Sequence, residues 1–156
     1  MNQDEAIIVD IDGTLSDPSD RRELVESDLN DWEGFFERVD EDYVNEYVSE
    51  IVYRFDSTHE VILVTGRPER SKEGVKVREK TVEWLEENNI PFDKLIMRDE
   101  GDFRDDVEVK QEILDERLPD SESILFALDD RSDIAEMWRE NGIPCLQTED
   151  KVNKNG

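Results

Sequence analysis

Apolar residues lie along this chain in short runs that polar segments separate. Amphipathic helices are indicated between the runs by apolar residues spaced three and four apart, as in the stripe from Val44 to Phe55. Strands alternating with helices predict an α/β domain, with a parallel sheet of about five strands and helices on both faces. The runs that fit buried strands are 6–10, 61–65, 95–97, 124–129 and 145–148.

One long segment interrupts this alternation. Residues 16–42 are strongly acidic and too long for a simple strand-to-helix loop, so we expect a small cap or lid there. Its aromatic residues Trp32, Phe35 and Phe36 suggest one short helix, and we expect them to pack rather than to contact substrate. We expect one domain over residues 1–150, followed by a frayed tail at 151–156.

Residues able to do chemistry follow the apolar runs. The carboxyl ends of parallel strands meet at one edge of a sheet, where ligands gather in such folds. We therefore expect these residues to form one site. They are Asp10, Asp12, Gly13 and Thr14 after the first run, Thr65, Gly66 and Arg67 after the second, and Asp129 and Asp130 after the fourth.

The types of these residues suit phosphoryl transfer. In an extended chain Asp10 and Asp12 would share a face, with Cα atoms about 6.6 Å apart. One carboxylate can attack phosphorus while the other donates a proton to the leaving oxygen. Converging carboxylates repel, which favours a hard cation such as Mg²⁺. Lys110, Thr65 and Arg67 would stabilise the charge on the phosphoryl oxygens.

The motifs resemble a known superfamily. "DIDGTL", "VTG", Lys110 and "LDD" are similar, in this order, to the four motifs of the haloacid dehalogenase (HAD) phosphohydrolases. The branch that the chain resembles most is the 3′-phosphatase domain of phage-type polynucleotide kinase–phosphatase. "VTGRPE", "RDEGDFRDDVEVKQEIL" and "ALDDRSDIAEMWRENGIPCLQ" carry that similarity, with Arg21 eleven residues after Asp10. The resemblance spans nearly the whole chain and implies a Rossmann-like HAD fold with a small cap insertion.

The resemblance also implies a role for each acidic residue of the site. Asp10 would be the nucleophile and Asp12 the general acid and base. Mg²⁺ would be held by Asp10, by the backbone carbonyl of Asp12 and by Asp129, with Asp130 supporting the metal site. Thr14 would shape the loop after the first strand.

The residues expected at the substrate follow from the same resemblance. Arg21 and Arg67 would bind the substrate, and Thr65 and Lys110 would grip the transferring phosphoryl group. Asp106 lies four residues before Lys110 and so on the same helical face, where it would orient the lysine.

The implied activity is Mg²⁺-dependent removal of 3′-phosphates from DNA or RNA ends, or from nucleoside 3′-phosphates, through an aspartyl-phosphate. The sequence contains no G-x-x-x-x-G-K-[ST] loop, so 5′-kinase chemistry is not expected of this chain. A separate kinase or ligase partner is therefore possible. Two alternatives stay open: a HAD phosphatase of nucleotides or other small phosphomonoesters, and a non-catalytic acidic binding scaffold.

The charge balance bears on the protein's surroundings. The chain has 44 acidic and 19 basic residues, a net charge of −25. This favours a solvated surface suited to a high-salt, halophilic cytoplasm over a nucleic-acid mimic or a surface for a basic partner. Because broad phosphate contact is unfavourable at this charge, we expect recognition of the terminal nucleotide alone. One cysteine, no apolar run near 20 residues and no basic leader predict a cytoplasmic protein without membrane contact.

Other candidates are weaker. His59, the only histidine, precedes the second strand and is expected at the opposite edge of the sheet, in solvent. Trp84 and Trp138 fit core positions. Arg104 and Arg131 adjoin the motifs, and contact with substrate is left open for both.

Overall fold

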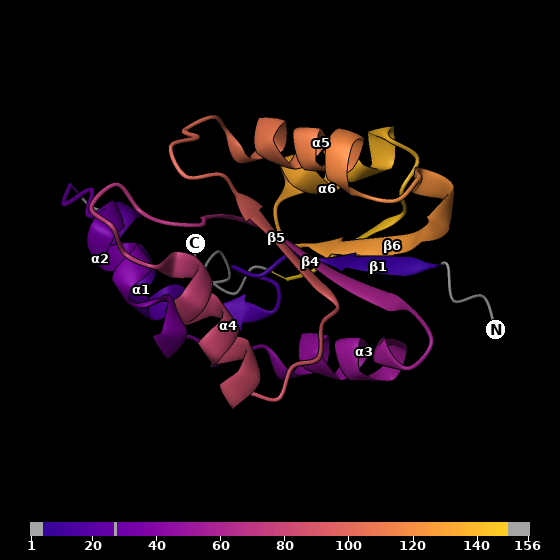
Figure 1. Cartoon of the computed structure of the whole chain (residues 1–156), viewed down its shortest axis with the longest axis horizontal. Helices are drawn as coiled ribbons and strands as arrows, with labels where there is room; N and C mark the ends of the chain where they lie inside the picture. Colours follow the sequence, from indigo (N-terminus) through magenta and orange to yellow (C-terminus); the bar gives the residue numbers. More distant parts are fainter. Residues whose placement is uncertain (1–4, 27, 150–156) are drawn as a thin grey trace.

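A five-stranded parallel sheet forms the centre of the molecule (Figure 1). The computed structural model describes residues 5–26 and 28–149. The strand order is β5-β4-β1-β6-β7, and β1 pairs in parallel with both β4 and β6. The expected α/β architecture is thus confirmed. The strands are β1 (Ala6–Val9), β4 (Glu60–Pro68), β5 (Lys94–Arg98), β6 (Ile124–Asp129) and β7 (Cys145–Gln147).

Helices cover both faces of this sheet, as Figure 1 shows: α3 (Glu46–Asp56) and α4 (Val77–Glu87) lie on one face, α5 (Asp106–Arg117) and α6 (Ser132–Glu140) on the other. Side chains alternate across a strand, so Ile8 of β1 packs into one core and Val9 into the other. Trp138 and Trp84 belong to these two cores, as expected. A central strand buried on both faces explains why its sequence reads as a continuous apolar run.

The apolar stripe from Val44 to Phe55 is longer than the helix it indicated. Val44 lies in strand β3 (Tyr43–Val44), and α3 begins only at Glu46. Within α3, Val48 and Val52 are fully buried, whereas Tyr47 is exposed. The helix face that packs on the sheet is therefore narrower than the sequence pattern predicts.

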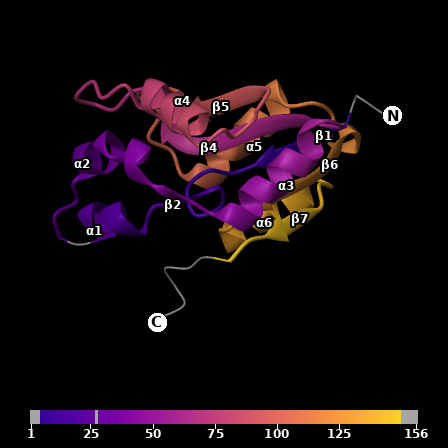
Figure 2. The same cartoon turned by 90° about the horizontal axis from the view of Figure 1, so that it is seen from below.

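The segment between β1 and α3 lies beyond the carboxyl ends of the central strands (Figure 2). We call residues 16–44 the cap segment. The short helix expected around Trp32, Phe35 and Phe36 is present as α2 (Trp32–Glu37), and the described part of the segment also contains a second helix and a short 3-10 helix that the sequence did not indicate. Its first and last strands pair in antiparallel fashion and close it. In order, its elements are β2 (Ser16–Asp17), α1 (Ser19–Glu26), α2 (Trp32–Glu37), η1 (Val39–Glu41) and β3.

Three smaller expectations can be compared with the structure. His59 is half-buried rather than solvated: its ring packs against Phe55 and lies within hydrogen-bonding distance of Thr58 and Glu5. Among the described residues, no helix has the length and apolar character needed to cross a membrane. The expected fraying of residues 151–156 lies outside the described part of the chain.

Candidate active site

The chain turns sharply after β1, and this turn sets the directions of two candidate catalytic residues. The expectation of an extended chain from Asp10 to Asp12 is wrong, because the strand ends at Val9 and residues 11–16 fold back. The amides of Thr14 and Ser16 both donate to the carbonyl of Ile11, at 3.0 and 2.9 Å. The two aspartates therefore have different partners.

Gly13 makes the turn possible. Its φ of +85° is a conformation that side chains with a Cβ rarely adopt. A Cβ atom here would also collide with the carboxylate of Asp130, which closes over the turn. The glycine of the "DIDGTL" sequence is thus required both by the backbone and by the site.

Three buried carboxylates meet at the carboxyl ends of β1 and β6. Asp10, Asp129 and Asp130 each offer an oxygen, and these oxygens all lie within 4.8 Å of one another. Lys110 reaches them from α5, with Nζ 2.8 Å from Asp10 Oδ1 and 2.9 Å from Asp129 Oδ2. Thr14 Oγ1 lies 3.0 Å from Asp10 Oδ2 and so fixes the orientation of this carboxylate.

One lysine does not neutralise three carboxylates. Burial and the neighbouring Asp129 raise the pKa of Asp10 well above its ordinary value, although Lys110 acts in the opposite direction. Burial alone would lower the pKa of Lys110, but Asp10 and Asp129 outweigh it and raise this pKa, so the ammonium stays charged. The excess negative charge and the all-oxygen donor set fit a hard divalent cation such as Mg²⁺.

Asp12 faces away from this cluster toward two arginines. Its Oδ1 accepts from Arg21 Nη2 at 2.5 Å and from Arg67 Nη2 at 2.7 Å. Burial opposes ionisation of this carboxyl, but Arg67 and Arg21 outweigh it and hold the pKa of Asp12 below its ordinary value. In this state Asp12 is therefore a carboxylate paired with both of the arginines that were expected to bind substrate.

Asp42 is a residue of the site that the sequence pattern did not reveal. Its carboxylate accepts two hydrogen bonds from Arg21, both at 2.8 Å, and lies 3.4 Å from Arg67 Nη2. The Trp84 indole donates to its backbone carbonyl at 2.8 Å. Asp42 thereby connects the cap segment to α4 and to both arginines. The only sequence signal was its position as the last acidic residue before β3.

The expectation that Asp106 orients Lys110 is wrong. Asp106 accepts instead from Arg98 Nη2 at 2.5 Å and from Arg131 Nη1 at 2.6 Å. It also lies so close to Gly66 that a Cβ there would collide with its carboxylate. Asp106 thus joins α5 to the ends of β5 and β6, because Arg98 and Arg131 lie at those ends.

A cavity of about 860 Å³ opens between these strand ends and the cap segment. Asp10, Asp12, Thr65, Arg67, Asp106, Lys110, Asp129 and Asp130 all contribute to its lining. Arg21 is not part of the lining that the described residues form, so a direct contact between Arg21 and substrate stays a prediction.

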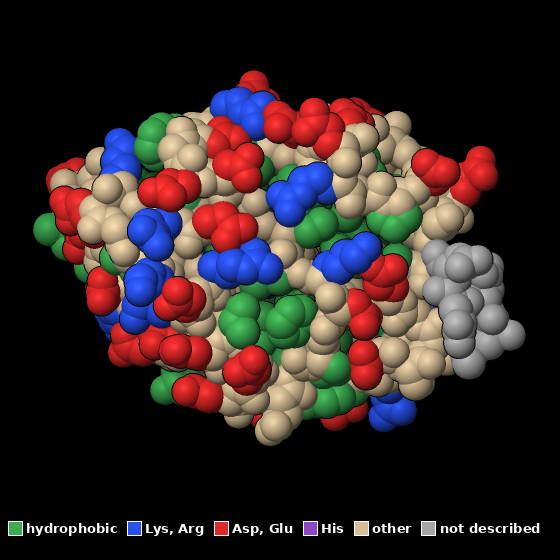
Figure 3. Space-filling model, viewed as in Figure 1, with side chains coloured by type: hydrophobic (Ala, Val, Ile, Leu, Met, Phe, Trp, Pro, Cys, Tyr) green, Lys and Arg blue, Asp and Glu red, His purple; other side chains and the backbone are tan. Residues whose placement is uncertain are grey.

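The wall of this cavity carries aromatic and basic side chains. Trp32, Phe35 and Phe36 pack against one another, as expected, with ring centroids 5.5–5.9 Å apart, and they also line the cavity. Arg104 and Arg131 line it as well. The basic residues of the lining are Arg22, Arg67, Arg70, Lys72, Arg98, Arg104, Lys110 and Arg131. Figure 3 shows one face of the outer surface, where acidic side chains are spread widely with basic side chains between them.

Comparisons with known proteins agree with this geometry. Residues 4–151 match the family described as the polynucleotide kinase PNKP phosphatase domain. A chain in the structure of the Pnkp1/Rnl/Hen1 complex is 31% identical over 96% of this chain, with a TM-score of 0.75. A chain in the structure of the Pnkp1/Rnl/Hen1 RNA repair complex is also 31% identical over 96% of this chain, with a TM-score of 0.74. This chain spans 47% and 45% of those two chains, about half of their length.

A more distant structure shows the fold alone. It is a HAD family enzyme from Bacteroides thetaiotaomicron, in complex with magnesium and inorganic phosphate. It is 12% identical, covers 94% of this chain and 95% of its own, and gives a TM-score of 0.56. Together with the sheet order and the acidic cluster, these findings confirm the HAD fold. The chain belongs to the family of polynucleotide kinase PNKP phosphatase domains.

Proposed function

We propose that this chain is a Mg²⁺-dependent phosphomonoesterase that removes 3′-phosphates from nucleic-acid ends. The observation that carries the proposal is the buried cluster of Asp10, Asp129 and Asp130 with Lys110, at the base of a cavity, in a chain of this family. The name of the relatives' assembly, an RNA repair complex, supports nucleic-acid ends as the substrate and a separate ligase or kinase as a partner. We propose that residues 1–150 form the one catalytic domain, with residues 16–42 as its lid.

In the first chemical step an Asp10 oxygen attacks phosphorus, and the bond from phosphorus to the 3′-oxygen breaks. Asp12 gives its proton to that oxygen, which leaves as a hydroxyl. Asp12 is ionised beside Arg21 and Arg67 in this structure. A dianionic phosphate beside it would raise its pKa through repulsion between like charges, which favours the protonated form that the step needs.

In the second step Asp12, now a carboxylate, takes a proton from water. The water oxygen attacks phosphorus, the bond from phosphorus to Asp10 breaks, and inorganic phosphate leaves. Throughout, the Lys110 ammonium offsets charge at Asp10, while Thr65 and Arg67 orient the phosphoryl oxygens.

Asp10, Asp129 and the backbone carbonyl of Asp12 would hold Mg²⁺, with Asp130 in support. When bound, the ion supplies positive charge against the phosphate oxygens. These carboxylates suit that role because burial, together with repulsion from Asp129 and Asp130, raises the pKa of Asp10 in the protein alone. Mg²⁺ should accordingly raise the thermal unfolding midpoint of the wild type, and raise it less in Asp129→Asn.

A panel of substrates tests the proposal. We expect turnover of 3′-phosphorylated DNA or RNA strands and of nucleoside 3′-phosphates, poor turnover of 5′-phosphates, and loss of activity with a chelator. Asp10→Asn should abolish turnover, whereas Asp20→Asn, an exposed acid of α1, should not alter it. Equal rates on 5′-phosphates or sugar phosphates would instead identify a phosphatase of small molecules. Absence of any turnover would leave the scaffold alternative.

A further inference from the structure

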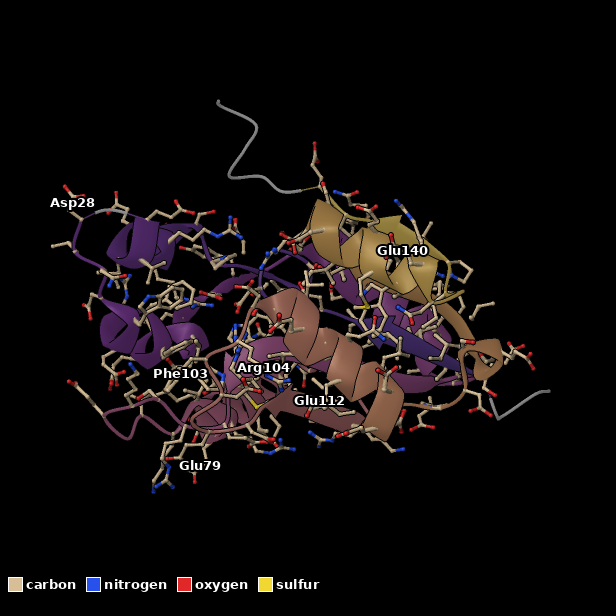
Figure 4. The ribbon with its side chains drawn as sticks, turned by 90° about the horizontal axis from the view of Figure 1, so that it is seen from above. Asp28, Glu79, Phe103, Arg104, Glu112 and Glu140 are labelled. Atoms are coloured by element: carbon tan, nitrogen blue, oxygen red, sulfur yellow. The ribbon has the colours of Figure 1, made fainter. Side chains whose placement is uncertain are left out.

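An aromatic side chain stands exposed at the mouth of the cavity. Phe103 lies on the loop between β5 and α5 and is 70% exposed, although it lines the same cavity as Asp10. Figure 4 shows it on the side of this loop nearest the cap segment. The ammonium of Lys72 lies 4.5 Å from the centre of its ring. A phenylalanine left in water beside a catalytic cavity offers a flat apolar surface to a ligand.

A second exposed aromatic residue reaches this cavity from the cap segment. Trp32 of α2 is 48% exposed and lines the cavity with Phe103. The next residue, Glu33, accepts a hydrogen bond from Ser71 Oγ at 2.5 Å and one from the Glu73 amide at 3.2 Å. These bonds hold α2 against the loop that carries Lys72. Three segments that are distant in sequence thus place aromatic and basic side chains at one mouth.

Two cations at this mouth have no ion-pair partner among the described residues, although Glu33, Glu100 and Asp102 also contribute to the lining. Arg98, Arg104 and Arg131, which also line the cavity, each pair with a carboxylate. Arg70 and Lys72 also line the cavity, but neither forms an ion pair with any residue that the structure describes. In a chain of net charge −25, these cations keep their charge available for an anion.

We propose that Phe103 is the stacking site for the base of an unpaired 3′-terminal nucleotide, with Lys72 and Arg70 pairing with the next phosphate of the strand. This inference rests on the proposed function and adds the part of the substrate recognised outside the phosphate. Stacking on an aromatic ring accepts every base, so the site serves any sequence. A paired terminal base is held by its partner strand and stacks on one neighbour, so it would have to leave the duplex to reach the ring, whereas an unpaired end need not break a pair.

The test compares two single strands that differ at their last nucleotide. Both carry a 3′-phosphate, but in one the terminal nucleotide is an abasic tetrahydrofuran residue. Phe103→Ala should lower kcat/KM on the normal strand about 5- to 150-fold, the range that one stacked base contributes. It should change kcat/KM on the abasic strand less than twofold. Deoxyribose and ribose versions of both strands show whether the site serves DNA, RNA or both.

Tyr43→Ala is the matched control, because Tyr43 is 71% exposed and lies in β3, outside the cavity lining. It should leave the turnover of both strands unchanged. If Phe103→Ala lowers kcat/KM equally on the normal and abasic strands, or on neither, the proposal of a stacking site is wrong.

A binding measurement separates this inference from the proposed function. Fluorescence anisotropy with the same strands and Asp10→Asn protein does not depend on turnover. Adding Phe103→Ala should weaken binding of the normal strand about 5- to 150-fold and leave the abasic strand unchanged. If the wild type hydrolyses neither strand, the proposed function fails, and the stacking site is still supported or rejected by these affinities.

Discussion

Replacing Asp42 by alanine tests how the cap segment is held to the site. Its carboxylate is 3% exposed and accepts two hydrogen bonds at 2.8 Å from Arg21, whose side chain is 1% exposed. Removing one partner of a buried ion pair costs about 3–5 kcal/mol, because the other charge is left uncompensated. Arg21 keeps its contact with Asp12, so we expect the free energy of unfolding to fall by about 3 kcal/mol, the lower end of this range.

Urea unfolding measures this loss. With a slope of roughly 1–3 kcal/mol per molar urea, the midpoint of Asp42→Ala should fall by about 1–3 M. Glu41→Ala is the matched control, since it removes the same charge from the neighbouring position. Glu41 is 60% exposed and lies 3.4 Å from Arg38, so its loss should cost less than about 1 kcal/mol.

Added salt should affect the Asp42→Ala and Glu41→Ala variants differently. Raising KCl from 0.1 to 1 M should reduce the small effect of Glu41→Ala and leave that of Asp42→Ala almost unchanged, because buried pairs are screened little. Similar losses in the two variants would show that the buried network does not hold the cap segment.

Three further predictions concern other parts of the molecule. Gly13→Ala should destabilise more than Gly74→Ala in thermal unfolding, since both have positive φ but only Gly13 meets a side chain, the carboxylate facing it. In urea unfolding, Lys110→Met should lower the free energy of unfolding by about 3–5 kcal/mol and Asp106→Asn by about 1 kcal/mol. Similar losses in the two variants would support the expected interaction between Asp106 and Lys110. Burial raises the pKa of Cys145 to about 11, so alkylation of the folded protein should be slow at pH 8 and quicken toward pH 11. The unfolded thiol ionises first, so this group's contribution to stability is present below about pH 9 and is lost toward pH 11.

The sheet was predictable because buried strands require apolar residues, and these are easily recognised in the sequence. β1 is covered on both faces, so its residues read as an unbroken apolar run. The acidic cluster followed from the same logic, since Asp10 and Asp129 end neighbouring parallel strands. Lys110 was expected at the site from its residue type and from the resemblance, and its contacts with both aspartates fit that expectation.

The cap segment was not predictable in the same way. Helix α1 has one buried residue, and this residue is Arg21 rather than an apolar side chain. Rules that search for an apolar stripe therefore find no helix there. Its buried side chain, Arg21, is held by ion pairs with Asp12 and Asp42, and such pairs depend on the packing of distant segments. For the same reason the partners of Asp106 could not be derived from its helical spacing.

The charge distribution leads to one last prediction. Self-repulsion at a net charge of −25 opposes the compact state, and it acts mainly between exposed acids. The Debye length falls from about 10 Å at 0.1 M salt to about 3 Å at 1 M, so added salt should remove most of this repulsion. The pairs of Arg21 with Asp12 and Asp42 are buried and should survive. The thermal midpoint should therefore rise between 0.1 and 1 M KCl, by about 2–4 °C for each kcal/mol gained. NaCl should give the same rise if screening is the cause. A midpoint that stays constant or falls would mean that surface repulsion does not limit the stability of this fold.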